Sequence, residues 1–182
     1  MIVFLRLIGI LNVAVWFGAG VFFTVGVAPA LFSAETKALL QQSYPILSGR
    51  LAMLVVSRYF LLHYWCGSIA LLHQLAERFY LGKPLQRLTF GVLIGLCTLS
   101  LLGGLWLQPS IRKLHEIKYG RSDIYSPAQK ALAEKAFPFW HGASRIVNVL
   151  VLGGLGFYLW RMANPGNGGG PRFTPPAGKF RS

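Results

Sequence analysis

Charged residues, and acidic residues above all, are scarce in this chain of 182 residues. Only 13% of the residues are charged, and only 5 are Asp or Glu. Soluble domains carry about twice that charged fraction. Hydrophobic residues make up 54% of the chain. This balance excludes an ordinary soluble domain and indicates a membrane protein.

Cysteine and catalytic motifs are also sparse. The two cysteines, Cys66 and Cys97, lie inside apolar stretches, where a free thiol behaves as a small hydrophobic group. The sequence has no CxxC motif or Cys/His cluster, so no metal site is predicted. It also has no carboxylate pair, no nucleophile and base at a recognisable spacing, and no phosphate-binding loop. We therefore predict no catalytic residues and no enzyme activity.

Apolar residues occur in four blocks, each long enough to cross a bilayer as a helix. The expected spans are residues 3–29, 49–75, 88–107 and 138–160. They predict an all-α integral membrane four-helix bundle over residues 1–162. Between the third and fourth spans, residues 109–136 predict two short interfacial helices joined at about 120–126. The Gly/Pro-rich, basic segment 163–182 predicts a disordered tail.

Positive charge surrounds the apolar blocks. The formal net charge is +13, and the cations lie in short loops and in the tail. This distribution predicts contact with anionic lipid head groups and no nucleic-acid binding. Four spans place both termini on one side. The cations divide evenly between the two sides, so they do not fix the orientation; we expect a multi-pass protein of the bacterial inner membrane with cytoplasmic termini.

A polar stripe runs along the fourth span. His141, Ser144, Arg145 and Asn148 have the spacing i, i+3, i+4, i+7, which places them on one helix face. Polar groups at membrane depth need a partner in protein, water or ligand. The predicted buried polar cluster contains seven residues from three spans: Asn12, Arg58, His63, His141, Ser144, Arg145 and Asn148.

The two arginines of this cluster, Arg58 and Arg145, are expected at similar depths. No acidic residue in the spans can pair with them. Three interpretations stay open. Each arginine can extend to the head groups, or belong to a structural polar network, or bind an anion such as phosphate, a lipid head group or a haem propionate.

Two segments resemble a known family. The residues WFGAGVFFTVGVAPALF (16–32) and FWHGASRIVNVLVLGGL (139–155) carry the resemblance. They resemble the transmembrane-protein-205-like family, whose bacterial members form domain of unknown function 4149. The resemblance implies a four-helix integral membrane protein and implies no reaction.

The leading functional hypothesis is a non-enzymatic structural or accessory subunit of a membrane assembly, without a cofactor. Its partners would be other membrane subunits or further copies of the chain. One alternative is a membrane protein that binds haem b through His63, or copper through His63 and Cys66, which are one helical turn apart. His63 and His141 are expected at different depths, which argues against a shared haem. The other alternative is an oligomeric pathway for a small solute or ion.

Overall fold

The structure is a computed structural model that describes residues 2–82, 86–120 and 123–164. The described residues form helices joined by short connections and contain no β-strand. In chain order, the elements are α1 (Ile2–Phe22), the π-helix η1 (Phe23–Val27), α2 (Ala28–Leu31), α3 (Ala34–Leu40), the 3₁₀-helix η2 (Gln41–Ser43), α4 (Tyr44–Leu81), α5 (Arg87–Leu102), the π-helix η3 (Gly103–Leu107), α6 (Gln108–Tyr119) and α7 (Pro127–Ala163).

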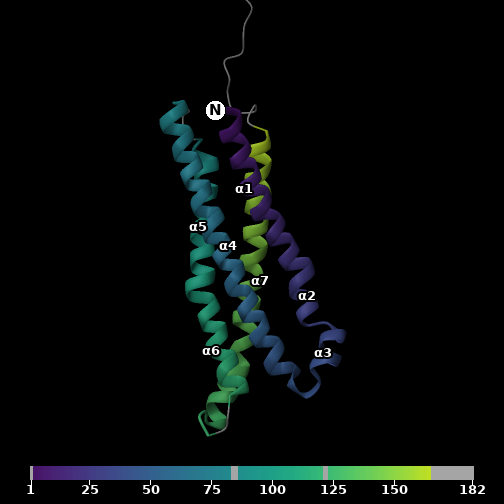
Figure 1. The fold of residues 1–182 in the computed structure, drawn as a ribbon. Coiled ribbons are helices and arrows are strands. Elements are labelled where there is room, and N and C mark those ends of the chain that lie inside the picture. The colour runs from purple at the N-terminus through teal and green to yellow at the C-terminus, as the bar shows by residue number, and fades with distance from the viewer. Residues whose placement is uncertain (1, 83–85, 121–122, 165–182) are drawn as a thin grey trace, which may run out of the picture.

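Four rods of this set are long and apolar enough to cross a membrane. They cover Phe4–Leu31, Ala34–Tyr80, Arg87–Tyr119 and Pro127–Ala163. Consecutive rods run in opposite directions, so α4 and α7 are parallel to each other (Figure 1). The predicted all-α four-helix membrane bundle is confirmed.

The core of the bundle lies where α1, α4, α5 and α7 meet. Trp16 and Val13 of α1, Leu93 of α5 and Leu155 of α7 are each 0% exposed. They belong to one hydrophobic cluster with residues of α4, among them Cys66 and Ala70. The outward surfaces of the helices carry large apolar side chains such as Trp65, as expected for a surface that faces lipid.

The two halves of the chain repeat the same helical pattern. The π-helices η1 and η3 begin at residues 23 and 103, and each is followed by a proline, Pro29 or Pro109, in the first turn of the next helix. The same separation of 80 residues relates the core pairs Val13 to Leu93 and Trp16 to Leu96. The rods α1–η1–α2 and α5–η3–α6 are therefore equivalent elements.

Helices α4 and α7 continue this repeat. Each contains a Ser-Arg pair, at 57–58 and 144–145, and a glycine ten residues after its serine, Gly67 or Gly154. Gly67 packs against Trp16 and Gly154 packs against Leu96. Because Trp16 and Leu96 are themselves equivalent, the chain consists of two similar helical hairpins.

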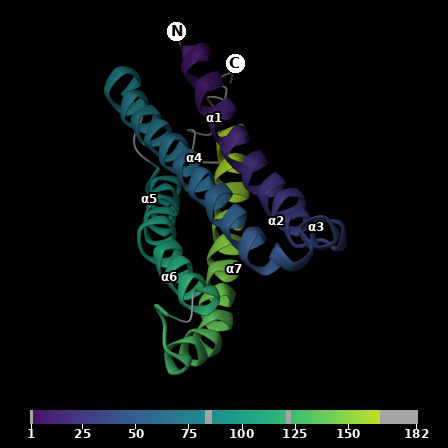
Figure 2. The same ribbon diagram turned by 60° about the horizontal axis from the view of Figure 1, so that its bottom comes forward.

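Several helices are longer than the sequence predicted. Both prolines that follow the π-helices lie in a first helical turn, where a missing N–H leaves no hydrogen bond unmade. The third rod therefore continues through α6 to Tyr119. The two short helices expected over 109–136 are helical, but they are not separate: the first is α6, and the second is the beginning of α7. Figure 2 shows α6 lying beside this part of α7, and an ion pair of 3.2 Å between Lys118 and Glu134 joins them.

The two ends of the described chain lie at the same end of the bundle (Figure 1). A guanidinium nitrogen of Arg6 lies 3.4 Å from the carbonyl oxygen of Ala163, to which it donates. Most of the segment expected to be disordered, residues 165–182, lies outside the described residues.

Candidate ligand-binding cavity

A cavity of about 640 Å³ lies in the half of the bundle away from the termini. Its wall comes from η1, α2, α4, α5, η3, α6 and α7, so both hairpins contribute. Both π-helices line it, and π-helical turns are frequent at functional sites because the extra residue changes the direction of side chains. The volume is in the range of small-molecule sites.

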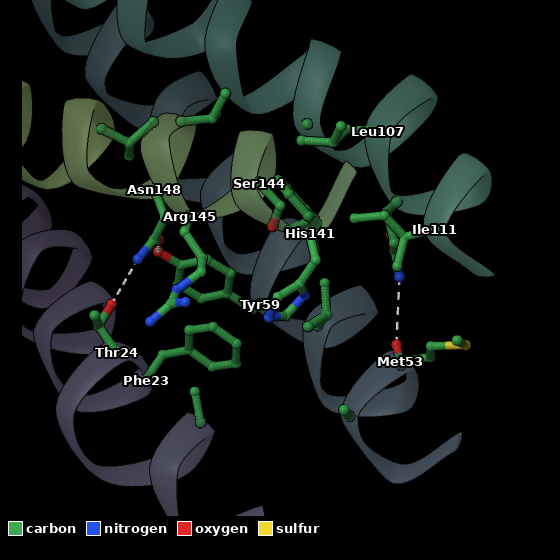
Figure 3. A pocket seen from close by; sticks show the side chains of 18 of the residues that line it. Phe23, Thr24, Met53, Tyr59, Leu107, Ile111, His141, Ser144, Arg145 and Asn148 are labelled. Atoms are coloured by element: carbon green, nitrogen blue, oxygen red, sulfur yellow. Dashed lines mark hydrogen bonds between the residues drawn. The ribbon is translucent and has the colours of Figure 1, made fainter. Parts of the chain in front are cut away.

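One polar chain crosses the bundle in the wall of this cavity. The Tyr59 hydroxyl donates to Asn148 Oδ1 over 3.0 Å, and Asn148 Nδ2 donates to Thr24 Oγ1 over 2.8 Å. Thr24 in turn donates to the carbonyl of Gly20 over 2.8 Å. Figure 3 shows this connection between α7 and η1. The amide of Asn148 therefore has a structural role, since it joins α4, α7 and the first rod.

Replacing Asn148 with leucine is expected to lower the free energy of unfolding by about 1 to 2 kcal/mol. Side-chain hydrogen bonds between membrane helices contribute on average about 0.6 kcal/mol each, and Asn148 makes two. Unfolding can be followed in SDS titrations by thiol labelling of Cys66, which is buried in the native state. Adding Tyr59→Phe to Asn148→Leu should cost little more. Additive losses would show that the two residues act separately.

A second polar group lies one helical turn further into the bundle. His63 on α4 is only 2% exposed. Its Nδ1 lies 2.9 Å from Trp16 Nε1 and 3.2 Å from Ser100 Oγ, so it connects α1, α4 and α5. Both His63 and Ser100 line the cavity. Nε2 of His63 is also buried and has no hydrogen-bond partner among the described residues.

Among the described residues that line the cavity, Arg145 carries the permanent positive charge; it was predicted to be buried but is exposed, as is His141. Figure 3 shows Arg145 and His141 pointing from α7 toward Phe23 and Tyr59. None of the described lining residues is Asp, Glu or Lys. Within the part of the chain that the structure describes, Arg145 makes no hydrogen bond or ion pair. An arginine beside an apolar cavity, without a carboxylate partner, leaves a positive charge available to a ligand.

The seven residues predicted as one buried polar cluster divide into two groups. His63, His141, Ser144, Arg145 and Asn148 line the cavity. Asn12 and Arg58 do not. Asn12 Nδ2 donates to the carbonyl of Cys66 over 2.9 Å, which is an interhelical contact within the core. Arg58 is exposed and is not among the described lining residues, although its neighbours Tyr59 and Phe60 both line the cavity.

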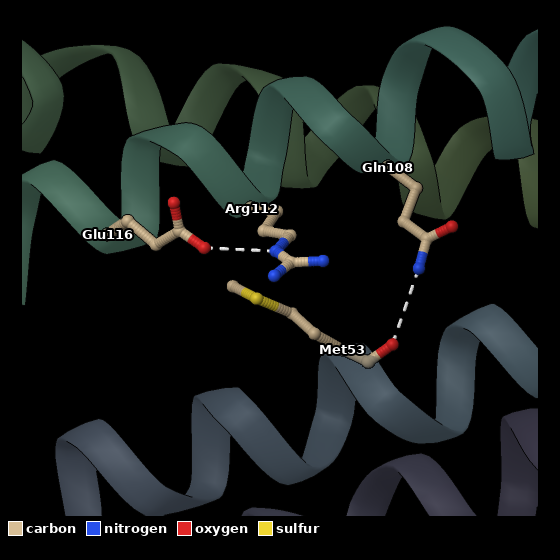
Figure 4. Close-up of polar contacts among 4 residues, drawn as sticks. All are labelled: Met53, Gln108, Arg112 and Glu116. Carbon is tan, nitrogen blue, oxygen red and sulfur yellow. Dashed lines mark hydrogen bonds and ion pairs between the residues drawn. The ribbon is translucent and has the colours of Figure 1, made fainter.

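The wall between α4 and α6 is held by polar contacts. Gln108 Nε2 donates to the carbonyl of Met53 over 3.3 Å, and both residues line the cavity. Figure 4 shows Gln108 reaching from α6 to α4, with the ion pair of Arg112 and Glu116 further along α6. The Gln108 contact joins the two hairpins at this side of the cavity, whereas the Arg112–Glu116 pair lies within α6 and is exposed.

Sequence analysis missed four residues of the site: Trp16, Thr24, Tyr59 and Ser100. Single hydroxyls and aromatic residues in an apolar block give no periodic signal. The internal repeat could have drawn attention to residues near 20–24 and 100–104, because Pro29 and Pro109 mark equivalent places in the two halves.

The geometry bears on the haem and copper alternatives. His63 and His141 both line the cavity, but they lie at different depths. The hydrogen-bonded pair Tyr59 and Asn148 marks one level of the bundle. His63 lies four residues beyond this level and His141 seven residues before it, so the two histidines are about 16 Å apart along the axis. That spacing does not suit one haem with two histidine ligands. Among the described residues, no group of three His, Cys, Asp or Glu side chains is arranged to hold a metal ion.

Comparison with known proteins places the chain in a family. The model of the family described as domain of unknown function 4149 matches residues 11–119, which is more than half of the chain. No curated protein and no solved structure matches. The match includes the first of the two segments that carried the resemblance and ends before the second, and the wider likeness to transmembrane-protein-205-like proteins stays a resemblance. The chain is a four-helix membrane protein that belongs to the family of domain of unknown function 4149.

Proposed function

We propose that this protein is a non-enzymatic membrane protein that binds an amphipathic anion in the cavity between its two hairpins. The observation that carries the proposal is the composition of the cavity wall. It combines an arginine without an acidic partner with apolar and aromatic side chains, among them Phe23, Val56 and Leu107. A charged group of the ligand would bind at Arg145, and its apolar part would lie against these side chains.

The same wall favours binding over catalysis. Ser144 and His141 lie on one face of α7, but no hydrogen bond joins them in the described structure, and the described lining offers no carboxylate to orient such a pair. Arg145 is a suitable partner for a phosphate or carboxylate because its guanidinium is always charged and presents several donors.

The test is lipid binding by delipidated protein, measured by native mass spectrometry. Phosphatidylglycerol is expected to bind more tightly than zwitterionic phosphatidylcholine. Arg145→Ala should weaken phosphatidylglycerol binding about 10- to 100-fold, because hydrogen bonds to charged groups contribute about 1.5 to 3 kcal/mol. Arg145→Lys should retain part of the affinity, and excess inorganic phosphate should compete weakly because it has no apolar part.

The matched control is Arg58→Ala. Arg58 occupies the equivalent Ser-Arg position in the other hairpin, but it lies outside the cavity. Its replacement should leave phosphatidylglycerol binding within about twofold of the wild type. Equal losses for the two alanine variants would mean that the lipid binds the outer surface of the bundle, and the proposal would be wrong.

We also propose that binding needs neither haem nor a metal. The Trp16 indole N–H is only a donor, so Nδ1 of His63 must accept, and the proton of the neutral ring is then on Nε2. A protonated nitrogen has no lone pair for a metal. A Soret band or bound copper in purified protein that is lost in His63→Ala would contradict this part of the proposal.

For the wider role, we propose an accessory subunit of an assembly in the bacterial inner membrane, with cytoplasmic termini. One feature supports it. Gly91 and Gly95 of α5 are exposed, and a methyl group added at either would meet nothing within 4 Å in the described structure. This GxxxG surface is available to another membrane helix. Co-purification of a discrete partner, lost in Gly95→Leu, is the expected result; purification of the protein alone under mild extraction would contradict it.

A further inference from the structure

The inner end of the cavity presents a hydrogen-bond donor without an acceptor. His63 is 2% exposed, lines the cavity, and has its Nδ1 directed at Trp16 and Ser100. Because Trp16 can only donate, the neutral ring carries its proton on Nε2. That N–H is buried and unpaired among the described residues. A buried donor without a partner is destabilising, so such a group is a strong indication of a missing acceptor.

The surroundings of His63 offer aromatic rings rather than lone pairs. Its ring makes edge contacts with Trp16 and Tyr59, at centroid distances of 5.7 and 4.3 Å, and a tilted contact with Phe60 at 6.2 Å. These contacts fix the orientation of the imidazole. An N–H directed at a ring gains little compared with a hydrogen bond to oxygen. An uncharged oxygen is the acceptor that suits a neutral donor in apolar surroundings.

The position of this donor relative to Arg145 limits the ligand. Tyr59 and Asn148 are hydrogen-bonded across α4 and α7 and so mark one level of the bundle. His63 lies four residues beyond that level on α4, and Arg145 lies three residues before it on α7. Since these helices are parallel, the two groups are about 10 Å apart along the axis. The ligand needs an anion near one end and an uncharged acceptor deeper in the cavity.

Resting on the proposed function, we propose that the ligand is an anionic glycerolipid with ester-linked acyl chains, and that His63 donates from Nε2 to an ester carbonyl of that lipid. Arg145 binds the anionic head group. A glycerolipid ester lies between the head group and the chains, which is the order of groups in this cavity. A fatty acid or alkyl phosphate supplies the anion and the chain but has no second acceptor for His63.

The experiment compares two lipids that differ only at the linkage. Delipidated protein is titrated with diacyl phosphatidylglycerol and with its diether analogue, and bound lipid is counted by native mass spectrometry. The wild type should prefer the ester about 2- to 10-fold, the range that one neutral hydrogen bond provides. His63→Phe should abolish the preference, while binding of both lipids still depends on Arg145. His63→Gln, which keeps an N–H donor, should restore part of it.

The matched control is His73→Phe. His73 is also buried on α4, at 4% exposed, but its Nε2 lies 2.8 Å from the carbonyl of Leu5, and it does not line the cavity. This variant should keep the ester preference. Equal wild-type affinity for ester and ether, with binding that still requires Arg145, would overturn the role of His63 and leave the proposed function standing. Loss of any dependence on Arg145 would overturn the proposed function itself. The wild-type comparison needs no variant, so it decides the matter even where His63→Phe does not fold.

Discussion

Replacing Trp16 with alanine is expected to lower the free energy of unfolding by about 3 to 5 kcal/mol, the usual cost of truncating a buried tryptophan. Trp16 is 0% exposed and belongs to the cluster in which all four rods meet. It packs against Gly67 of α4, which has no side chain to move into the space that would be left. It also donates to Nδ1 of His63 over 2.9 Å, and that nitrogen would lose this partner. SDS titration with thiol labelling of Cys66 measures the loss.

Two further variants separate the parts of this effect. Trp16→Phe keeps a large ring but removes the indole N–H, so its cost should be smaller, about 1 to 3 kcal/mol. Trp65→Ala is the matched control, because Trp65 lies on α4 at 66% exposed and is outside the described hydrophobic core cluster. Its replacement should change the free energy of unfolding by at most about 0.5 kcal/mol. Similar losses for Trp16→Ala and Trp65→Ala would contradict the assignment of Trp16 as the centre of the core.

The architecture could be predicted because hydrocarbon imposes a simple rule on the sequence. A chain that crosses a bilayer must satisfy its backbone hydrogen bonds internally, so each long apolar block becomes a helix. The start of α3 has a local cause, because Ser33 caps the helix and accepts a hydrogen bond from the N–H of Thr36. The positions of the helix ends were harder to predict from the sequence. The third span was expected to end at residue 107, but Pro109 lies in a first helical turn after the π-helix, and the helix continues.

The polar face of α7 could be predicted from spacing alone, whereas its partners could not. His141, Ser144, Arg145 and Asn148 share one face because of helical periodicity, and all four line the cavity. Which side chains from other rods meet them depends on helix rotation, which composition does not determine. Arg58 illustrates this: it was expected at a depth similar to that of Arg145, but among the described residues only Arg145 of the two lines the cavity.

The internal repeat shows which residues around the cavity the two hairpins share and which they do not. The two hairpins share their packing residues, since Val13 corresponds to Leu93 and the glycine contacts of Gly67 and Gly154 are equivalent. Some of their other residues differ. At the positions equivalent to Trp16 and Thr24, the second hairpin has Leu96 and Gly104. At these two positions the halves differ, whereas Ser144 and Arg145 repeat the Ser-Arg pair of the first hairpin at 57–58.

Close packing at the rim of the cavity gives the second large expected effect, from Gly49→Leu. Gly49 is buried on α4, and a methyl group added there would overlap the imidazole of His115 on α6. His115 is 6% exposed, and its ring centroid lies 4.7 Å from that of Tyr119 and 6.4 Å from that of Phe137. The imidazole therefore has little space into which to move.

Gly49→Leu is expected to force α6 away from α4 and to lower the free energy of unfolding by about 1 to 3 kcal/mol, the usual cost of overpacking. Gly91→Leu is the matched control, because a Cβ added at Gly91 on α5 would meet nothing within 4 Å in the described structure. Its cost in free energy of unfolding should be at least about 1 kcal/mol smaller than that of Gly49→Leu. Adding His115→Ala to Gly49→Leu removes the obstructing ring and should recover part of the loss, since the two positions share one space. The loss in Gly49→Leu and its recovery in the double variant are both measured by SDS titration with thiol labelling of Cys66. Equal costs for Gly49→Leu and Gly91→Leu, with no recovery in the double variant, would show that α4 and α6 are not held in close contact at the cavity.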